Sequence, residues 1–241
     1  MLDGPRQLQN SAHEQGTQVV CVIGTRPEVI KMAPVIHQLK RRQLSVFVLS
    51  TAQHRELLDE LVAFFGIAID HDLNAMTANQ SLSALSGRLI AALGDTLTGL
   101  SPKIVVAQGD TNTVMATAVA CFYSSIPFAH VEAGLRTGDL SQPFPEEFNR
   151  VVAAKAASVH FAPTARARSN LLREGISANA IYLTGNTVID ALHWTAARKP
   201  RLNIPIAAGR RVLLVTLHRR ENFGEPLHDV LSALRLLAFR N

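Results

Sequence analysis

The sequence predicts an α/β fold with a parallel, Rossmann-like sheet. Short β-branched runs recur along the chain, most of them end in a polar or glycine-containing turn, and apolar residues at helical spacing follow. Strands that alternate with helices in this way are typical of a parallel sheet covered by helices on both faces. The composition agrees with a globular chain, because 47% of the 241 residues are hydrophobic and 18% are charged.

The first half of the chain supplies four of these strands. Three of them lead directly into a segment whose apolar residues have helical spacing. In chain order the strand segments are QVVCVI, SVFVLST, PKIVVAQGD and IPFAHVEAG. The helical segments are PEVIKMAPVIHQLKRR, HRELLDELVAFFG and TNTVMATAVACFYSS.

The second half continues the alternation of strands and helices. SVHFAPT, AIYLTGN and RVLLVTLH predict three more strands, and helices are expected over residues 165–174 and 187–197. The segment RKPRLNIPIAAGRR separates the last two strands. It is rich in proline, glycine and arginine, which favours a linker between two domains.

We therefore expect four parts. Residues 1–17 form a disordered tail, 18–198 an N-terminal Rossmann-like domain, 199–209 a linker, and 210–241 the beginning of a second domain. The last part is too short to bury a core of its own, so we expect the second domain to be truncated. The tail lacks the apolar stretch of a secretory signal, and both cysteines lie in apolar segments, which favours a cytoplasmic protein with reduced thiols.

Several functional classes are excluded by what the sequence lacks. No apolar stretch approaches the roughly 20 residues of a membrane-spanning helix, and the cysteines have no partners at metal-ligand spacing. GxGxxG, GxxxxGK[ST], HExxH and GxSxG are absent, which argues against a dinucleotide redox enzyme, a P-loop NTPase, a zincin and a serine hydrolase. The formal charge of +5 favours anionic ligands, but the aromatic content of 5% is low for a nucleic-acid platform. We expect no cofactor, no metal and no nucleic-acid partner.

Polar residues follow the strands where doubly wound sheets bind their ligands. The amides of Gly24-Thr25-Arg26 and the Arg26 side chain suit a phosphate, with ordinary turn chemistry as the alternative. Asp110 follows the PKIVVAQG strand, where it is a candidate catalytic acid or a helix cap. Further along, His218 and Arg219 resemble a phosphate clamp, with a solvated loop as the alternative.

Two more acids, Glu132 and Glu146, fall at the same expected edge of the sheet. His130 and Glu132 match the start of a zinc-deaminase motif, but the P-C-x-x-C partner is missing and a core role is favoured for the histidine. Glu146 and Glu147 open a helix, so a purely structural interaction with the helix dipole is the alternative to catalysis. Asn186 lies in a later strand-to-helix turn. Together these residues predict a cofactor-free carboxylate site that faces a phosphorylated ligand.

Seven collinear segments resemble the non-hydrolysing UDP-N-acetylglucosamine 2-epimerases. They are GTRPEVIKMAPVI, TAQHRELLDEL, QGDTNTVMA, HVEAGLRTGDL, PFPEEFNR, LTGNTVIDAL and VTLHRRENFG. The resemblance spans about Val19 to His228 and implies a GT-B architecture, in which two Rossmann-like domains hold a nucleotide sugar between them. It also implies reversible epimerisation of UDP-N-acetylglucosamine to UDP-N-acetylmannosamine at C2, through elimination of UDP to a glycal and its re-addition.

The resemblance implies roles for individual residues. The catalytic group is Asp110, Glu132, Glu146 and His218. The contacts to substrate or UDP are Arg26, Arg136, Asn186 and Arg219. A second, activating substrate site would include Gln53, His54 and Arg88. Full-length members are typically homodimers.

The sequence departs from the family in one respect and leaves two other functions open. Family members carry a D-S-G-G-x-x-E-E-type segment that holds UDP, and this sequence has none, so we expect weak or absent turnover from the 241-residue chain. A hydrolysing epimerase, which releases UDP and free N-acetylmannosamine, is the first alternative. The second is a non-catalytic module that binds a UDP-sugar.

Overall fold

The computed structural model describes residues 18–51, 55–75, 77, 80–199, 209, 212–216 and 224–240. The chain divides into two units, Met1–Lys199 and Pro200–Asn241. Several predictions lie outside the described residues: the tail over 1–17, most of the linker, and Gln53, His54, His218 and Arg219.

The first unit is built on a seven-stranded sheet in which every neighbouring pair is parallel. The spatial order is β3-β2-β1-β4-β5-β6-β7. The direction of winding reverses between β1 and β4, and ligands of such sheets bind beyond the carboxyl ends of the strands at this reversal. The strands are β1 (Val19–Ile23), β2 (Val46–Ser50), β3 (His71–Asp72), β4 (Ile104–Gln108), β5 (Phe128–Val131), β6 (Val159–Ala162) and β7 (Ile181–Leu183).

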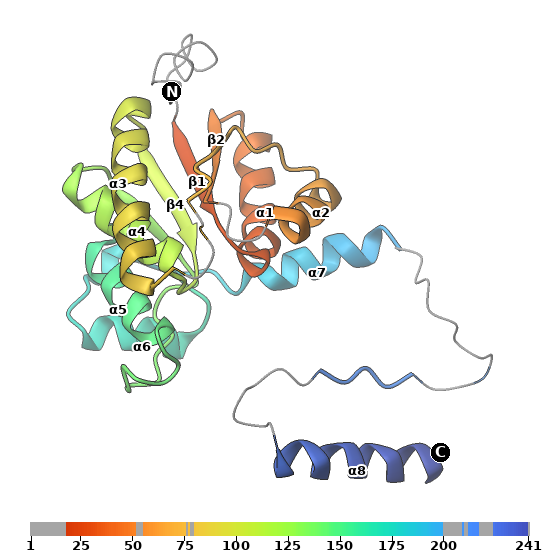
Figure 1. Ribbon diagram of the computed structural model, residues 1–241. Coiled ribbons are helices and arrows are strands. Elements are labelled where there is room, and N and C mark those ends of the chain that lie inside the picture. The colour runs from red at the N-terminus through yellow and green to blue at the C-terminus, as the bar shows by residue number, and fades with distance from the viewer. Residues whose placement is uncertain are drawn as a thin grey trace. The chain divides into compact units, whose positions relative to one another are not determined.

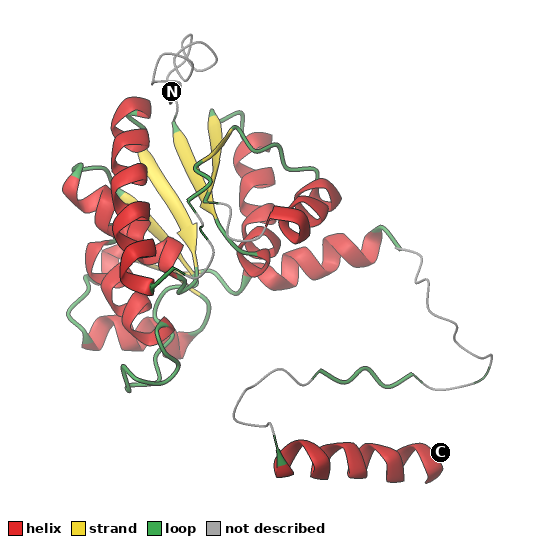
Figure 2. Ribbon diagram, viewed as in Figure 1, coloured by secondary structure: helices red, strands yellow, loops and turns green. Residues whose placement is uncertain are grey.

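Helices cover both faces of the sheet, as Figures 1 and 2 show. One face carries α1 (Arg26–Arg41), α2 (Arg55–Phe65) and α7 (Thr187–Ala197). The other carries α3 (Leu82–Leu100), α4 (Asn112–Tyr123), α5 (Glu146–Ala156) and α6 (Ala165–Arg173), and the 3-10 turn η1 (Ala178–Ala180) precedes β7.

Burial of both faces of the sheet explains why its strands are continuously apolar. In β1, Val20 and Val22 pack into the cluster formed with α3 and α4, whereas Cys21 and Ile23 pack into the cluster formed with α1 and α2. Successive side chains of a strand point to opposite faces, so a strand buried on both sides needs an apolar residue at every position.

The helix α3 and the strand β3 were not predicted from the sequence. The helix α3 contains Gly87, Gly94 and Gly99, which lower helix propensity and obscure the pattern. Burial of leucines spaced four residues apart stabilises it, and the Ser81 hydroxyl caps it by accepting the Ala84 amide at 3.2 Å. The strand β3 has only two residues, too few to give an alternating pattern.

The strand predicted over RVLLVTLH is wrong for the part that the structure describes. Residues 212–216 are irregular, and Leu214 is 88% exposed. A strand requires a neighbour to pair its backbone groups, and no described residue pairs with this segment. The second unit also contains the helix α8 (Glu225–Arg240). Over the described residues, no helix has the length and apolar character needed to cross a bilayer.

Candidate active site

The loops at the carboxyl edge of the sheet bring several predicted residues to one side of the first unit. Arg26 is the first residue of α1, Asp110 follows β4 by two residues, and Glu132 directly follows β5. Glu146 is the first residue of α5, and Asn186 precedes α7. Parallel strands end at a common edge, so side chains far apart in the sequence meet there.

Three donors hold the carboxylate of Glu132. Lys31 Nζ in α1 lies 2.6 Å from Glu132 Oε2, and the Gln108 side-chain amide donates to the same oxygen. Asn186 Nδ2 donates to Glu132 Oε1 at 2.7 Å, while Asn186 Oδ1 accepts the Val188 amide at 3.0 Å and caps α7. Both oxygens of Glu132 are therefore oriented by residues from three different elements.

Asp110 forms the second centre of the site. Arg150 Nη2 lies 2.5 Å from Asp110 Oδ2, and the Asp110 side chain is one-third exposed. Burial raises the pKa of Asp110; Arg150 counteracts this rise, and the negative charges of Glu146 and Glu132 add to it. The helix cap suggested for Asp110 is wrong, because the Thr111 hydroxyl caps α4 by accepting the Val114 amide.

The two glutamates that open α5 have different roles. Glu147 is 1% exposed, and its Oε1 accepts the backbone amides of Thr137 and Gly138 at 3.0 Å each. This carboxylate therefore fixes the loop before α5. Glu146 is half-buried, and in the part of the chain that the structure describes its carboxylate makes no hydrogen bond or ion pair. Glu146 remains available for chemistry.

The arrangement combines carboxylates with two cations that the sequence analysis missed. The effects of Glu132, Glu146, Lys31 and Arg150 on the pKa of Asp110 show that all five groups share one electrostatic environment. Lys31 lies inside α1 and Arg150 inside α5, where a cation looks like a solvated helix residue. The signal that could have found Arg150 is its position one helical turn after Glu146.

Two other predicted residues, Arg136 and Arg88, have hydrogen-bond partners outside this cluster. Arg136 pairs with Glu174, with Nε 2.7 Å from Oε1 and Nη2 2.9 Å from Oε2. Its guanidinium is thus engaged by a carboxylate of the segment after α6, and its role in substrate binding stays a prediction. Arg88 is exposed on α3 and donates to Gln80 Oε1 at 2.5 Å.

Buried histidine supports the loop that carries Asp110. His130 is fully buried in β5, which agrees with the core role favoured by the sequence, and its Nε2 lies 2.7 Å from the Gly109 carbonyl oxygen. Burial lowers the pKa of His130 to about 4. A neutral ring with the proton on Nε2 is therefore the form that donates to Gly109. No group of described residues has the composition of a metal site.

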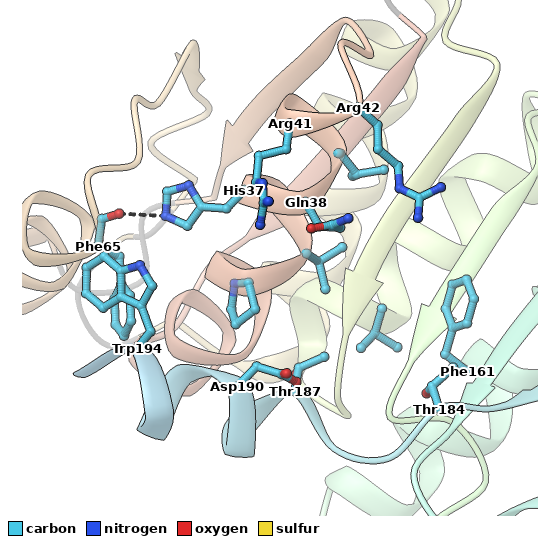
Figure 3. Close-up of a pocket in the computed structure, with 14 residues that line it drawn as sticks. His37, Gln38, Arg41, Arg42, Phe65, Phe161, Thr184, Thr187, Asp190 and Trp194 are labelled. Carbon is cyan, nitrogen blue, oxygen red and sulfur yellow. Dashed lines mark hydrogen bonds between the residues drawn. The ribbon is translucent and has the colours of Figure 1, made fainter. Parts of the chain in front are cut away.

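A cavity of about 880 Å³ lies on the side of the sheet covered by α1 and α7. Figure 3 shows the Trp194 ring beside Phe65, with His37 Nε2 2.8 Å from the Phe65 carbonyl oxygen. Most of the surface that lines this cavity is apolar, and the lining residues include none of Asp110, Glu132 and Glu146. The cavity is therefore distinct from the carboxylate cluster.

Comparison with known proteins gives a consistent result. Residues 37–241 match the family profile described as UDP-N-acetylglucosamine 2-epimerase. The UDP-N-acetylglucosamine 2-epimerase of Salmonella typhimurium is 45% identical over 239 residues, which cover 93% of this chain and 62% of that protein. That of Escherichia coli K12 is 44% identical over 232 residues, again covering 62% of the relative.

Solved structures agree with the sequence relatives. A Staphylococcus aureus MnaA structure with UDP superposes with a TM-score of 0.83 at 37% identity, covering 93% of this chain and 59% of that one. The Neisseria meningitidis UDP-GlcNAc 2-epimerase bound to UDP-GlcNAc gives a TM-score of 0.72 at 46% identity, covering 75% and 50%. The Rossmann-like α/β fold predicted from the sequence is confirmed, and it is shared with these GT-B enzymes. The chain spans about 60% of the length of its curated relatives and belongs to the UDP-N-acetylglucosamine 2-epimerase family.

Proposed function

We propose that the protein interconverts UDP-N-acetylglucosamine and UDP-N-acetylmannosamine without hydrolysing either. The observation that carries this proposal is the gathering of Asp110, Glu132 and Glu146 with Lys31 and Arg150 at one edge of the sheet. Family membership supports it, as do the relatives' structures with UDP-GlcNAc or UDP.

The chemistry requires acid and base groups on two faces of the sugar. The C2 hydrogen is not acidic in the ground state, so the C2 proton leaves as the C1–O bond to UDP breaks. The products are a glycal and UDP. Re-addition of UDP at C1, with protonation of C2 from the opposite face, gives the epimer. This route needs no net oxidation or reduction.

Two carboxylates fit the proton transfers best. Asp110 has a raised pKa, which brings its proton affinity closer to that needed near neutral pH. The carboxylate of Glu146 has no hydrogen-bond or ion-pair partner within the described residues, so no bond has to break before it can react. Glu132 is held by three donors and would keep the Lys31 ammonium in place beside the reacting sugar.

The departing diphosphate needs positive charge. Arg26, exposed at the start of α1, is proposed to contact UDP through its guanidinium, because the backbone amides of Gly24 and Thr25 donate to Glu28 Oε2 and are not free for a phosphate. His218 and Arg219 are proposed to complete this function, and Arg136 and Asn186 to contact the substrate. We further propose that Gln53, His54 and Arg88 form an activating substrate site and that the enzyme is a cytoplasmic homodimer. Two free, buried thiols are compatible with a reducing compartment.

The test is proton NMR of the 241-residue chain with UDP-N-acetylglucosamine in deuterated water, with UDP binding measured by calorimetry on the same sample. Deuterium at C2 together with UDP-N-acetylmannosamine would support the proposal, and the turnover expected of the 241-residue chain is weak or absent. Accumulation of free UDP and N-acetylmannosamine would establish the hydrolysing alternative instead.

The same samples test the remaining alternative. Saturable binding of UDP-N-acetylglucosamine without exchange at C2 would identify a binding module. A folded chain that neither binds UDP nor exchanges the C2 hydrogen would overturn the proposal.

A further inference from the structure

We propose that Glu28 is a positioning residue that locks the loop after β1, which leads into Arg26, to the loop after β4, which carries Asp110. Glu28 lies in the first turn of α1 and is 2% exposed. The functional part of this proposal rests on the proposed function, in which Arg26 contacts UDP and Asp110 acts on the sugar.

Both oxygens of Glu28 are engaged, and they face different loops. Oε2 accepts the backbone amides of Gly24 at 2.5 Å and of Thr25 at 2.9 Å. Oε1 accepts the Thr111 hydroxyl at 2.5 Å, from a residue 83 positions further along the chain. One buried side chain thus joins the two loops on either side of the point where the sheet reverses its winding.

The bond to Thr111 exceeds what helix capping requires. A glutamate at this position of a helix commonly returns to the backbone amide of the capping residue, and the bond to Thr25 has that role. Thr111 belongs to another helix, where its hydroxyl oxygen also accepts the Val114 amide at 3.3 Å. Since Thr111 follows Asp110 directly, the bridge fixes the peptide that carries the proposed base.

The surrounding packing leaves little room for the loops to slide. A Cβ added at Gly24 would lie 2.3 Å from Thr51 Oγ1 and 2.5 Å from Thr113 Oγ1. These two hydroxyls lie 2.9 Å apart and join the end of β2 to α4. The backbone after β1 therefore lies directly against both neighbouring elements.

The ionised form of Glu28 suits this environment, because all three of its partners are donors. Burial raises the pKa of Glu28 to about 7, even though the bonds from Thr111, Gly24 and Thr25 lower it. A buried carboxylate that is retained at this cost is expected to contribute order to its surroundings.

Loss of the bridge should affect turnover more than affinity. Arg26 can still meet a phosphate when the loops move apart, but the reacting atoms then lose their alignment, and small misplacements lower rates strongly. For Thr111→Val we expect the rate of C2 exchange to fall about 10-fold or more, with the Kd for UDP changed by less than about 3-fold.

The variants separate the bridge from the helix cap. Thr111→Val removes both, whereas Thr111→Ser keeps the hydroxyl and should restore exchange. Thr164→Val is the matched control, because the Thr164 hydroxyl caps α6 through the Ala167 amide at 3.1 Å and makes no bond to another loop in the described chain. Glu28→Gln should slow exchange in the same way, and Glu28→Gln combined with Thr111→Val should add little, since both remove one bridge.

A ligand-free measurement distinguishes this proposal from the proposed function. Amide hydrogen exchange at Gly24 and Thr25 should accelerate in Thr111→Val and stay unchanged in Thr164→Val. Unchanged protection in Thr111→Val would refute the bridge, and faster amide exchange with normal turnover would refute its positioning role. If the chain without substitutions does not bind UDP, but amide exchange at Gly24 and Thr25 is still faster in Thr111→Val, then the proposed function is wrong and the bridge is supported.

Discussion

At the scale of single residues, Asp110 is subject to opposing influences. Burial and the neighbouring acids favour its protonated form, and Arg150 favours its ionised form. Asp110→Asn keeps the shape of the side chain and removes its basicity. We expect C2 exchange to fall at least about 100-fold, the range of general acid–base catalysis.

The control is Asp59→Asn on the exposed surface of α2. It makes the same chemical change away from the cluster, so NMR in deuterated water should show unaltered exchange. Circular dichroism of both variants verifies the fold. Full exchange in Asp110→Asn would remove Asp110 from the mechanism.

His130 makes the free energy of unfolding of the first unit depend on pH. Its pKa falls from 6.5 to about 4 in the folded state because of burial. Between these values the unfolded chain binds a proton that the folded chain does not, so the free energy of unfolding decreases as the pH falls, by up to about 3 kcal/mol. His130→Gln can still donate to the Gly109 carbonyl and does not titrate in this range. In urea unfolding at several pH values, the free energy of unfolding of His130→Gln should fall less steeply with decreasing pH than that of the unsubstituted chain. The same pH dependence in both proteins would contradict the assignment of this effect to His130.

The sequence predicts the acids of the site better than their partners. Asp110, Glu132 and Glu146 each follow a strand or begin a helix, so topology alone gathers them at one edge. Lys31 and Arg150 lie within helices, and only the packing of α1 and α5 against the sheet brings them to Glu132 and Asp110. The ion pair between Arg136 and Glu174 likewise depends on tertiary structure, so the local sequence does not predict it.

At the scale of elements, glycine has opposite consequences in the loop after β1 and in α3. Gly24→Ala places a Cβ against two hydroxyls, and we expect it to lower the free energy of unfolding by about 1–3 kcal/mol. Gly87→Ala in α3 meets open space and should raise that energy by about 0.5–1 kcal/mol, because alanine is the better helix former. Urea midpoints measure both changes. A stable Gly24→Ala would show that the junction can relax.

The same comparison explains which elements can be predicted. Strands such as β1 and β4 are read easily because burial on both faces makes them uniformly apolar. In α3 the glycines hide a helix that tertiary packing of its leucines supports. In residues 212–216 an equally apolar run has no strand neighbour among the described residues, so its apolar pattern alone does not produce a strand.

At the scale of the whole molecule, the two thiols report whether the first unit unfolds as one body. Cys21 and Cys121 are free, buried and located in different core clusters, and burial raises the pKa of each to about 12. Because the sheet is shared by both clusters, a thiol reagent should modify both at one rate, and that rate should follow global unfolding in urea. Peptide mass spectrometry resolves the two sites. Faster modification of one cysteine would show that its face opens separately.

The backbone at Glu132 also has a consequence for mutational tolerance. Its φ of 66° lies in the left-handed region, which disfavours a glutamate and suits glycine or asparagine. Selection for folding alone would favour those two residues here. A library randomised at this position and sorted by folding should therefore enrich glycine and asparagine, whereas the same library sorted by C2 exchange should retain glutamate. Glutamate at this turn would then be retained for catalysis although its backbone conformation is unfavourable for folding stability.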